Sequence, residues 1–252
     1  MAQSGDGPKK KRRTSTNIVH SGRDPFAHHG FVNPPVYRGS TVLFKSLDAF
    51  EKREQRYVYG RRGTPTTDAL EDAICTLEGG VRTWLTPSGA AAIAAALLAF
   101  TKTGDHILVA DTVYQPTRKM CNGILKRFGV ETTFYDPLIG ADVATLFKPN
   151  TRAIVVEAPG SQSFEMPDIP AIAKAAQDKG ILVIDDNTWA TPLYHRSLDQ
   201  GVDISIQAGT KYIGGHSDIM FGTISANKAL APKIKETVNT LGLCAGPDDI
   251  YL

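Results

Sequence analysis

The sequence predicts an α/β protein with a mainly parallel sheet that helices cover on both faces. From about residue 84 onwards, short strand-like segments alternate with helical patterns, an order that is typical of parallel strands joined by helical crossovers. Two predicted strands, at 182–185 and 204–208, lead into ionisable residues. The carboxyl ends of parallel strands form the ligand-binding edge of such sheets, so these residues are expected to lie together. The 252 residues suffice for one large domain or two small ones.

Residues 1–62 are predicted to form a basic tail and an arm, and residues 63–252 the main domain. Residues 1 to about 17 are expected to be disordered. Their basic run at 9–13 suits a nuclear-localisation or nucleic-acid patch, but no aromatic residue interleaves the charges, which favours a solvated tail and no nucleic-acid partner. Residues 17–44 are irregular, and Pro34 and Pro35 exclude a helix around them. Such an arm needs a surface to lie against, which a partner subunit would supply.

Two helices are predicted before the first strand. The first, at 47–56, is short and charged. The second has Thr67 as its expected N-cap and stops at Gly79 and Gly80. Between them, residues 57–65 combine tyrosine, arginine and glycine. These residue types suit phosphate binding, because guanidinium binds phosphate through two hydrogen bonds and glycine permits close approach, although the signal alone is weak.

The next unit is a strand, a turn and a helix. Residues 84–86 lead through Ser88 and Gly89 into an alanine-rich helix that ends near Thr101. A helix N-terminus offers free backbone N–H groups to an anion, and an ordinary serine cap is the equal alternative. The elements that follow are predicted as strands at 106–110, 131–134, 153–157, 182–185, 204–208 and 223–226, and as helices at 115–128, 141–147, 169–179 and 229–241.

The composition excludes several classes of protein. The formal net charge of +2 indicates nothing about a polyanionic partner, and the longest apolar run, at 89–100, is too short and too rich in alanine to span a bilayer. No apolar segment of the kind found in secretory signals follows the tail. The three cysteines and six histidines are scattered, without metal-ligand spacing or a disulfide framework. A cytoplasmic protein without a membrane or metal site is therefore expected.

Lys211 is the residue around which the chemistry of the chain is organised. A lone lysine after a strand is commonly a solvated surface residue. Asp186, at the exit of another strand, favours a different interpretation. An amine that faces an acid suits pyridoxal phosphate, because the amine binds the cofactor covalently and the acid keeps its pyridine nitrogen protonated. Tyr114, which also follows a strand, either stacks on a planar cofactor or is a core or rim tyrosine. These residues, with Ser88 and Gly89, are predicted to share one edge of the sheet.

Several motifs resemble the Cys/Met-metabolism family of pyridoxal-phosphate enzymes, whose fold type I is the aspartate-aminotransferase architecture. They are YGRRGTPT at 59–66, PSGAAA at 87–92, YDPLIGAD at 135–142, DNTWATPLY at 186–194 and SIQAGTKYIGGHSDIMFG at 205–222. The tryptophan after Asn-Thr and the PLIGAD string resemble the cystathionine β-lyase branch more than the γ-synthase, γ-lyase or sulfhydrylase branches. The resemblance implies α,β-elimination of cystathionine, an amino-acid substrate, to homocysteine, pyruvate and ammonia, as in methionine biosynthesis and transsulfuration.

The resemblance also implies a role for each matching residue. Lys211 would hold the cofactor and move protons, Asp186 would pair with the pyridine nitrogen, and Tyr114 would stack on the ring. Tyr59 and Arg61 would reach the phosphate from a neighbouring subunit, which implies a homo-oligomer, expected as a dimer of dimers. Lys211, Tyr114 and Tyr59 form the implied catalytic set. The other residues implied around the phosphate are Ser88, Gly89, Ala90 and Thr210.

The sequence departs from the family pattern at two places. Asp185 stands where the family more often has an apolar residue, and the sequence gives it no role. Family members continue beyond the string GPDDIYL into a C-terminal domain with an arginine that holds the substrate carboxylate, and no residue here matches it. A chain without that domain is therefore expected, and three alternatives stay open: a γ-acting family member such as methionine γ-lyase, an inactive fragment that binds the cofactor, and a dinucleotide-binding domain. The last lacks the expected G-x-G-x-x-G motif after the first strand.

Overall fold

The computed structural model describes residues 12–252, and a seven-stranded sheet forms its centre. The strand order is β1-β7-β6-β5-β4-β2-β3. Among these strands, β7 runs antiparallel to both of its neighbours and all other pairs are parallel. The predicted mainly parallel sheet is confirmed. The strands are β1 (Arg82–Thr86), β2 (His106–Ala110), β3 (Glu131–Tyr135), β4 (Thr151–Glu157), β5 (Leu182–Asp186), β6 (Ile204–Gln207) and β7 (Gly222–Ala226).

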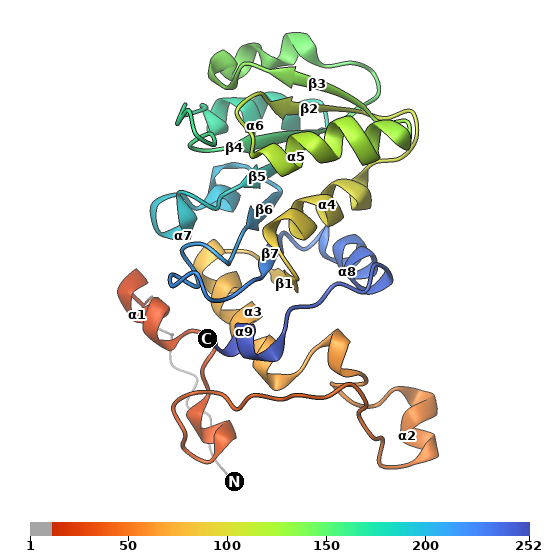
Figure 1. Ribbon diagram of the computed structural model, residues 1–252, viewed down its shortest axis with the longest axis vertical. Coiled ribbons are helices and arrows are strands. Elements are labelled where there is room, and N and C mark those ends of the chain that lie inside the picture. The colour runs from red at the N-terminus through yellow and green to blue at the C-terminus, as the bar shows by residue number, and fades with distance from the viewer. Residues whose placement is uncertain (1–11) are drawn as a thin grey trace.

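Helices cover both faces of this sheet. Helix α4 packs on β1, β6 and β7, and Figure 1 shows α4 and α5 lying across one face. Helix α3 packs on β1 and β7 from the other face, and α6 contacts β5. The longer helices are α3 (Pro65–Glu78), α4 (Gly89–Phe100), α6 (Ile169–Gln177) and α8 (Ala231–Thr240); the shorter ones are α1 (Thr14–His20), α2 (Leu47–Lys52), α5 (Gln115–Met120), α7 (Thr191–Tyr194) and α9 (Pro247–Tyr251).

The two faces of the sheet differ in polarity because successive strand residues point to opposite sides. Ile206 and Ile224 belong to the main apolar core, to which the small residues of α4 contribute. The alternate residues Ser205 and Ser225 face α3, and Ser225 hydrogen-bonds Thr83 at 2.7 Å. A buried polar layer therefore lies between α3 and the sheet. No helix of residues 12–252 is long and apolar enough to cross a membrane.

Helix boundaries differ from the predicted ones where short-range capping decides them. Helix α3 begins at Pro65 and is capped by Thr64, whose hydroxyl accepts from the Thr67 N–H at 3.1 Å, so the expected cap at Thr67 is wrong. Proline is favoured in a first helical turn because no N–H is needed there. The helix predicted at 115–128 is α5 followed by a π-helical turn, Cys121–Leu125. The helix predicted at 141–147 is a 3-10 segment, Pro137–Leu146, with a kink at Gly140.

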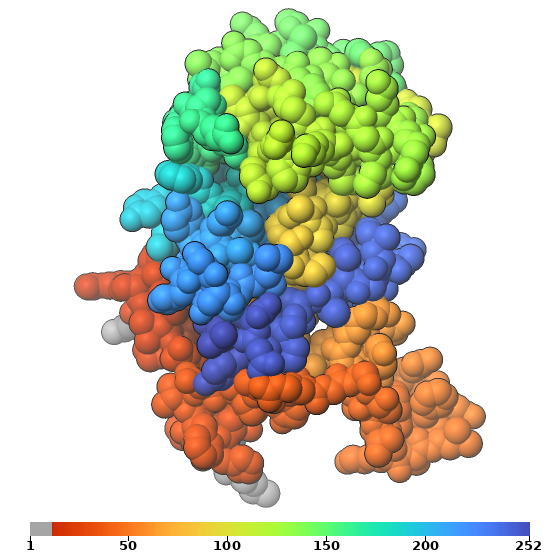
Figure 2. All heavy atoms as spheres, in the orientation of Figure 1, coloured from red at the N-terminus to blue at the C-terminus, as the bar shows by residue number. Residues whose placement is uncertain are grey.

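The N-terminal arm is more ordered than predicted. Thr14–His20 is helical, and Pro25–His28 forms a 3-10 turn, where the sequence suggested disorder and irregular chain. In Figure 2 this arm, coloured red to orange, covers one end of the molecule and extends beyond the layers around the sheet. Residues 9–11 of the basic run lie outside the described part of the chain.

Candidate functional site

The exits of β5 and β6 are joined by hydrogen bonds. Asp186 ends β5, and Thr188 donates its hydroxyl to Asp186 Oδ1 at 2.5 Å. The same Thr188 hydroxyl accepts from the Ala208 N–H at 2.8 Å, just beyond β6. The carboxylate is therefore fixed against the start of the segment that carries Lys211. Burial raises the pKa of Asp186, and the hydrogen bonds from Thr188 oppose that rise because they favour the charged form.

The N-terminus of α4 lies against the same exit. The Ser88 hydroxyl accepts from the Ala91 N–H at 3.1 Å and caps the helix. A Cβ on Gly89 would lie 2.6 Å from the Cβ of Ala208, so the helix start and the β6 exit meet at a point where only glycine fits. The first N–H groups of a helix have no partner within it, and here they belong to Gly89 and Ala90. This arrangement suits a bound phosphate.

Gly89→Ala should separate these two segments. The added methyl would meet the Cβ and Cα atoms of Ala208 at 2.6 and 2.8 Å, and neither atom can rotate away. We expect a loss of about 1–3 kcal/mol in unfolding free energy, together with weaker phosphate binding. The matched control is Gly123→Ala: a Cβ there meets nothing within 4 Å, and its helical position predicts a gain of up to about 1 kcal/mol. Denaturant unfolding measures both. Equal effects of the two substitutions would contradict the close contact.

Lys211 lies in a turn beyond β6 rather than directly at the end of the strand. Its N–H donates to the Ala208 carbonyl at 2.9 Å, its carbonyl accepts from Gly215 at 2.7 Å, and its side chain is exposed. The preceding Thr210 is tied to Phe221, whose carbonyl accepts the Thr210 N–H at 3.2 Å. The lysine thus sits on a short, hydrogen-bonded turn, and its amine is free to approach a ligand at the sheet edge.

Tyr114 comes to this edge just after β2. Glu157, a residue that the sequence analysis did not identify, holds it in place. The Tyr114 N–H donates to Glu157 Oε2 at 2.7 Å, and the ring is half exposed. Glu157 ends β4 and is the register partner of Asp186 on β5. Burial raises the pKa of Glu157, and the neighbouring Asp186 raises it further. Its place at a strand exit is the signal that could have identified it.

An aromatic row lines the loops that follow β4, β5 and β6. Phe164, Trp189 and Tyr212 come one from each loop, and each is about half exposed. The ring centroids of Phe164 and Trp189 are 5.1 Å apart, and those of Trp189 and Tyr212 are 5.8 Å apart, both with edge-to-face geometry. Tyr212 directly follows Lys211. Such pairs stabilise the loops on which the candidate residues stand.

Tyr59 and Arg61 lie in a different part of the chain. They line a cavity of about 320 Å³ between the arm, α3 and the segment around Leu243, and none of the other predicted site residues lines it. Arg61 donates to the Asn239 carbonyl at 2.9 Å, and its guanidinium carbon is 5.9 Å from the centroid of the Tyr59 ring. Within one chain, therefore, the structure brings together Ser88, Gly89, Ala90, Tyr114, Asp186, Thr210 and Lys211, but not Tyr59 and Arg61.

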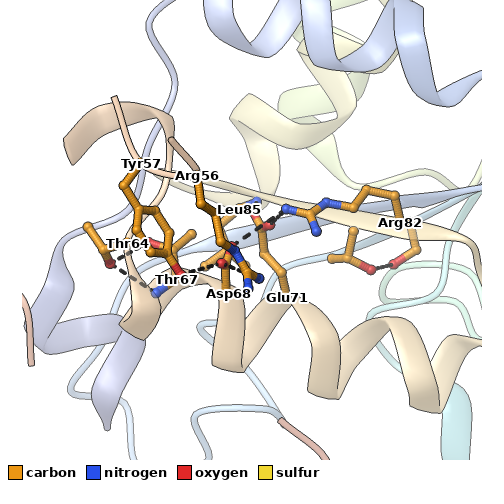
Figure 3. Close-up of polar contacts among 10 residues, drawn as sticks. Arg56, Tyr57, Thr64, Thr67, Asp68, Glu71, Arg82 and Leu85 are labelled. Atoms are coloured by element: carbon orange, nitrogen blue, oxygen red, sulfur yellow. Dashed lines mark hydrogen bonds and ion pairs between the residues drawn. The ribbon is translucent and has the colours of Figure 1, made fainter. Parts of the chain in front are cut away.

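A charged network ties the segment before Tyr59 to α3 (Figure 3). Asp68 accepts from the Tyr57 hydroxyl and pairs with Arg56, both at 2.7 Å. Arg82 of β1 pairs with Glu71 at 2.5 Å, and burial raises the pKa of Glu71 to about 7. These contacts give the arm a defined path over α3, next to the cavity.

The residues at the sheet edge fit pyridoxal phosphate in chemical type. They supply free helix N–H groups, an amine, a carboxyl group and an aromatic ring from four strand exits. Among the described histidine, cysteine, aspartate and glutamate side chains, no group of three or more could hold a metal ion.

The chain is similar to a family of known enzymes. Residues 15–252 match the model of the "Cys/Met metabolism PLP-dependent enzyme" family. The chain is 56% identical over 237 residues to a putative cystathionine beta-lyase of Rhizobium johnstonii, covering 94% of this chain and 60% of that protein. It is 44% identical over 244 residues to the cystathionine beta-lyase of Haemophilus influenzae, covering 94% and 62%.

Among solved structures, the chain is similar to a cystathionine gamma-lyase from Lactobacillus plantarum. The TM-score is 0.89 at 35% sequence identity, and the match covers 95% of this chain and 62% of that one. The chain thus spans about 60% of the length of these three proteins. The predicted fold type and the resemblance to enzymes that use pyridoxal phosphate are confirmed. The chain belongs to the Cys/Met-metabolism family of pyridoxal-phosphate enzymes.

Proposed function

We propose that this protein binds pyridoxal phosphate and cleaves L-cystathionine by α,β-elimination to homocysteine, pyruvate and ammonia. One observation carries the proposal: the α4 N-terminus, Asp186 and the Lys211 turn meet at one sheet edge, in a chain that is 44% and 56% identical to proteins named as cystathionine β-lyases. The reaction class follows from those relatives, and the edge supplies the groups that it needs.

Each residue at the edge then has a part in the reaction. When bound, the cofactor withdraws electrons from the α-carbon of the substrate. Lys211 would hold the cofactor, and its amine would take the α-proton. Asp186 would keep the pyridine nitrogen protonated, and Tyr114, held in place by Glu157, would lie against the ring. The N–H groups at the start of α4, with Ser88 and Thr210, bind the phosphate.

Tyr59 and Arg61 act, in this proposal, on the phosphate of a second copy of the chain. Their distance from the other site residues within one chain supports the idea, since they line a separate cavity near the arm. The site is then complete only in a homo-oligomer, for which we propose a dimer of dimers. We also propose that residues 1–62 act as the arm and 63–252 as the cofactor domain. With Cys75, Cys121 and Cys244 all free, the cytoplasm suits the protein.

The keto acid released from cystathionine tests the proposed reaction. Elimination at the β-carbon gives pyruvate, and elimination at the γ-carbon gives 2-oxobutyrate and cysteine. We expect pyruvate in equal amount to homocysteine from the chain loaded with cofactor. Release of 2-oxobutyrate would instead support the γ-lyase reaction, which the similarity to the Lactobacillus plantarum structure favours as second candidate. Bound cofactor with neither product would reduce the function to cofactor binding.

A further inference from the structure

Two carboxyl groups are buried on the face of the sheet opposite the core that packs on α4. Asp185 of β5 and Glu78, the last residue of α3, both have no exposed surface. Glu78 Oε1 accepts from the Ser205 hydroxyl at 3.0 Å and also from the Gln207 amide. Ser205 is the register partner of Asp185. Glu78 therefore lies against Ser205 of β6, next to Asp185 of β5, on the two strands that end at Asp186 and lead to Lys211.

Each acid has one oxygen that makes no hydrogen bond with any described residue. These atoms are Glu78 Oε2 and Asp185 Oδ1. Asp185 Oδ2 is engaged, since it accepts from the Ser197 hydroxyl and lies 3.5 Å from Nε2 of His195. A buried carboxylate oxygen without a partner is costly, and two such oxygens in one layer are more so. A proton on Glu78 removes one of the two buried charges and leaves Asp185, whose other oxygen is engaged, as the anion of the pair.

Charge balance points to the same arrangement. With both acids ionised and His195 protonated, the layer would hold a net charge of −1 away from water. With Glu78 neutral, Asp185 ionised and His195 protonated, the charges cancel. The directions of the pKa shifts agree. Burial raises the pKa of Glu78 to about 7, and the interaction of His195 with Asp185 raises the pKa of His195.

The other titratable groups around this layer do not supply a compensating cation. The Cys75 thiol, on α3, donates to the Gly80 carbonyl, and Tyr135 donates its hydroxyl to the Val155 carbonyl. Arg196 pairs with Asp199 at 3.1 Å and is about 40% exposed. The residues that β6, β7 and β1 contribute to this face are neutral: Ser205, Gln207, Thr223, Ser225 and Thr83.

We propose that the folded protein holds a proton on Glu78, beside the ionised Asp185, and that these two residues with His195 form a charge-neutral group that positions the ends of β5 and β6. This gives Asp185 a function that the sequence left open: it fastens the segment after α7 to the strand that carries Asp186. Glu78 and Asp185 are positioning residues, since both act through Asp186 and the Lys211 turn. The cofactor-binding consequence rests on the proposed function above, whereas the proton on Glu78 does not.

The pH dependence of stability tests the proton. In the unfolded chain Glu78 ionises near its ordinary pKa of 4.5, but in the folded protein it ionises near 7, so the folded state binds more protons between these values and stability falls as pH rises through them. Glu78→Gln keeps a neutral donor and removes this loss. We expect the unfolding equilibrium constants of wild type and Glu78→Gln to be similar near pH 4.5 and to diverge by up to about tenfold per pH unit up to pH 7.

The exposed Glu236 on α8 provides the matched control, because Glu236→Gln should show no such divergence above pH 5. If the difference between Glu78→Gln and wild type stays constant from pH 5 to pH 8, Glu78 is ionised in the folded protein and the proposal is wrong. This measurement needs no cofactor, so it stands or fails separately from the proposed enzymatic function.

Cofactor titration tests the positioning role. At pH 6, Glu78→Ala should bind pyridoxal phosphate at least about tenfold more weakly than wild type, whereas Glu78→Gln should restore the affinity to within about twofold. A folded Glu78→Ala chain with the affinity of wild type would overturn the positioning role. If Glu78→Ala does not fold, the comparison at pH 8 decides: Glu78→Gln should bind the cofactor more tightly than wild type, and equal affinities would refute the role.

Discussion

Lys211→Ala should abolish covalent attachment of pyridoxal phosphate and lower the rate of β-elimination by about a thousandfold or more. The substitution removes the side chain beyond Cβ, including the amine, but leaves the turn intact, because backbone hydrogen bonds to Ala208 and Gly215 hold it. Fold and stability should therefore change little. Borohydride reduction followed by mass spectrometry of the peptides detects the attachment, and pyruvate release from cystathionine measures the rate.

Lys228→Ala is the matched control. Lys228 is also exposed and also lies in a turn just after a strand, β7, so the substitution removes the same side chain from a similar local setting. It should leave both attachment and rate unchanged. Cofactor that is still reduced onto the Lys211→Ala chain, or elimination at the rate of wild type, would assign the chemistry to a different residue.

The fold could be predicted because each strand has a local sequence pattern of its own. The strand at 106–110 was predicted with the bounds that β2 has in the structure, and the other strands were placed within two residues of their observed ends. Alternation of strands and helices then gives a parallel sheet with little ambiguity. The antiparallel direction of β7 was not predicted, because strand direction depends on how the connection from β6 returns, which no local pattern reports.

Helix ends were less predictable, since a single hydrogen bond decides among several good caps. Thr64 and Thr67 are both suitable N-cap residues, and Pro65 resolves the choice in favour of Thr64. Similarly, the helical pattern of 115–128 contains no signal for the π-turn at Cys121–Leu125. The order of the arm depends on contacts such as that between the Tyr37 N–H and the Thr66 hydroxyl at 2.9 Å, which join distant segments.

In the candidate site, the residues that directly follow strands could be predicted. Asp186 and Tyr114 could be placed at one edge because each follows a strand, and topology then brings them together. Glu157 ends a strand too, but no further sequence pattern distinguishes it, because its role depends on the hydrogen bond that it accepts from the Tyr114 N–H. The two buried acids Glu78 and Asp185 could not be predicted together, because one ends a helix and the other lies on a strand more than a hundred residues later.

Asp186→Asn should lower the rate of elimination by about a hundredfold or more while the fold is preserved. Asparagine has nearly the same shape, and its carbonyl oxygen can still accept from the Thr188 hydroxyl and N–H, so the link from β5 to the Ala208 segment survives. Only the negative charge is lost. Without it the pyridine nitrogen of the bound cofactor is not kept protonated, and the cofactor withdraws electrons less well.

The loss of charge also makes a second, independent prediction. Glu157 is the register partner of Asp186, and the charge on Asp186 helps to raise the pKa of Glu157, so this pKa should fall in Asp186→Asn. Carboxyl-carbon NMR with labelled glutamate measures that shift in the chain without cofactor. Asp142→Asn, at an exposed position, is the matched control and should change neither the rate nor the pKa of Glu157. A rate within a few-fold of wild type in Asp186→Asn, alongside a lowered Glu157 pKa, would show that the charge is present as described but is not required for the reaction.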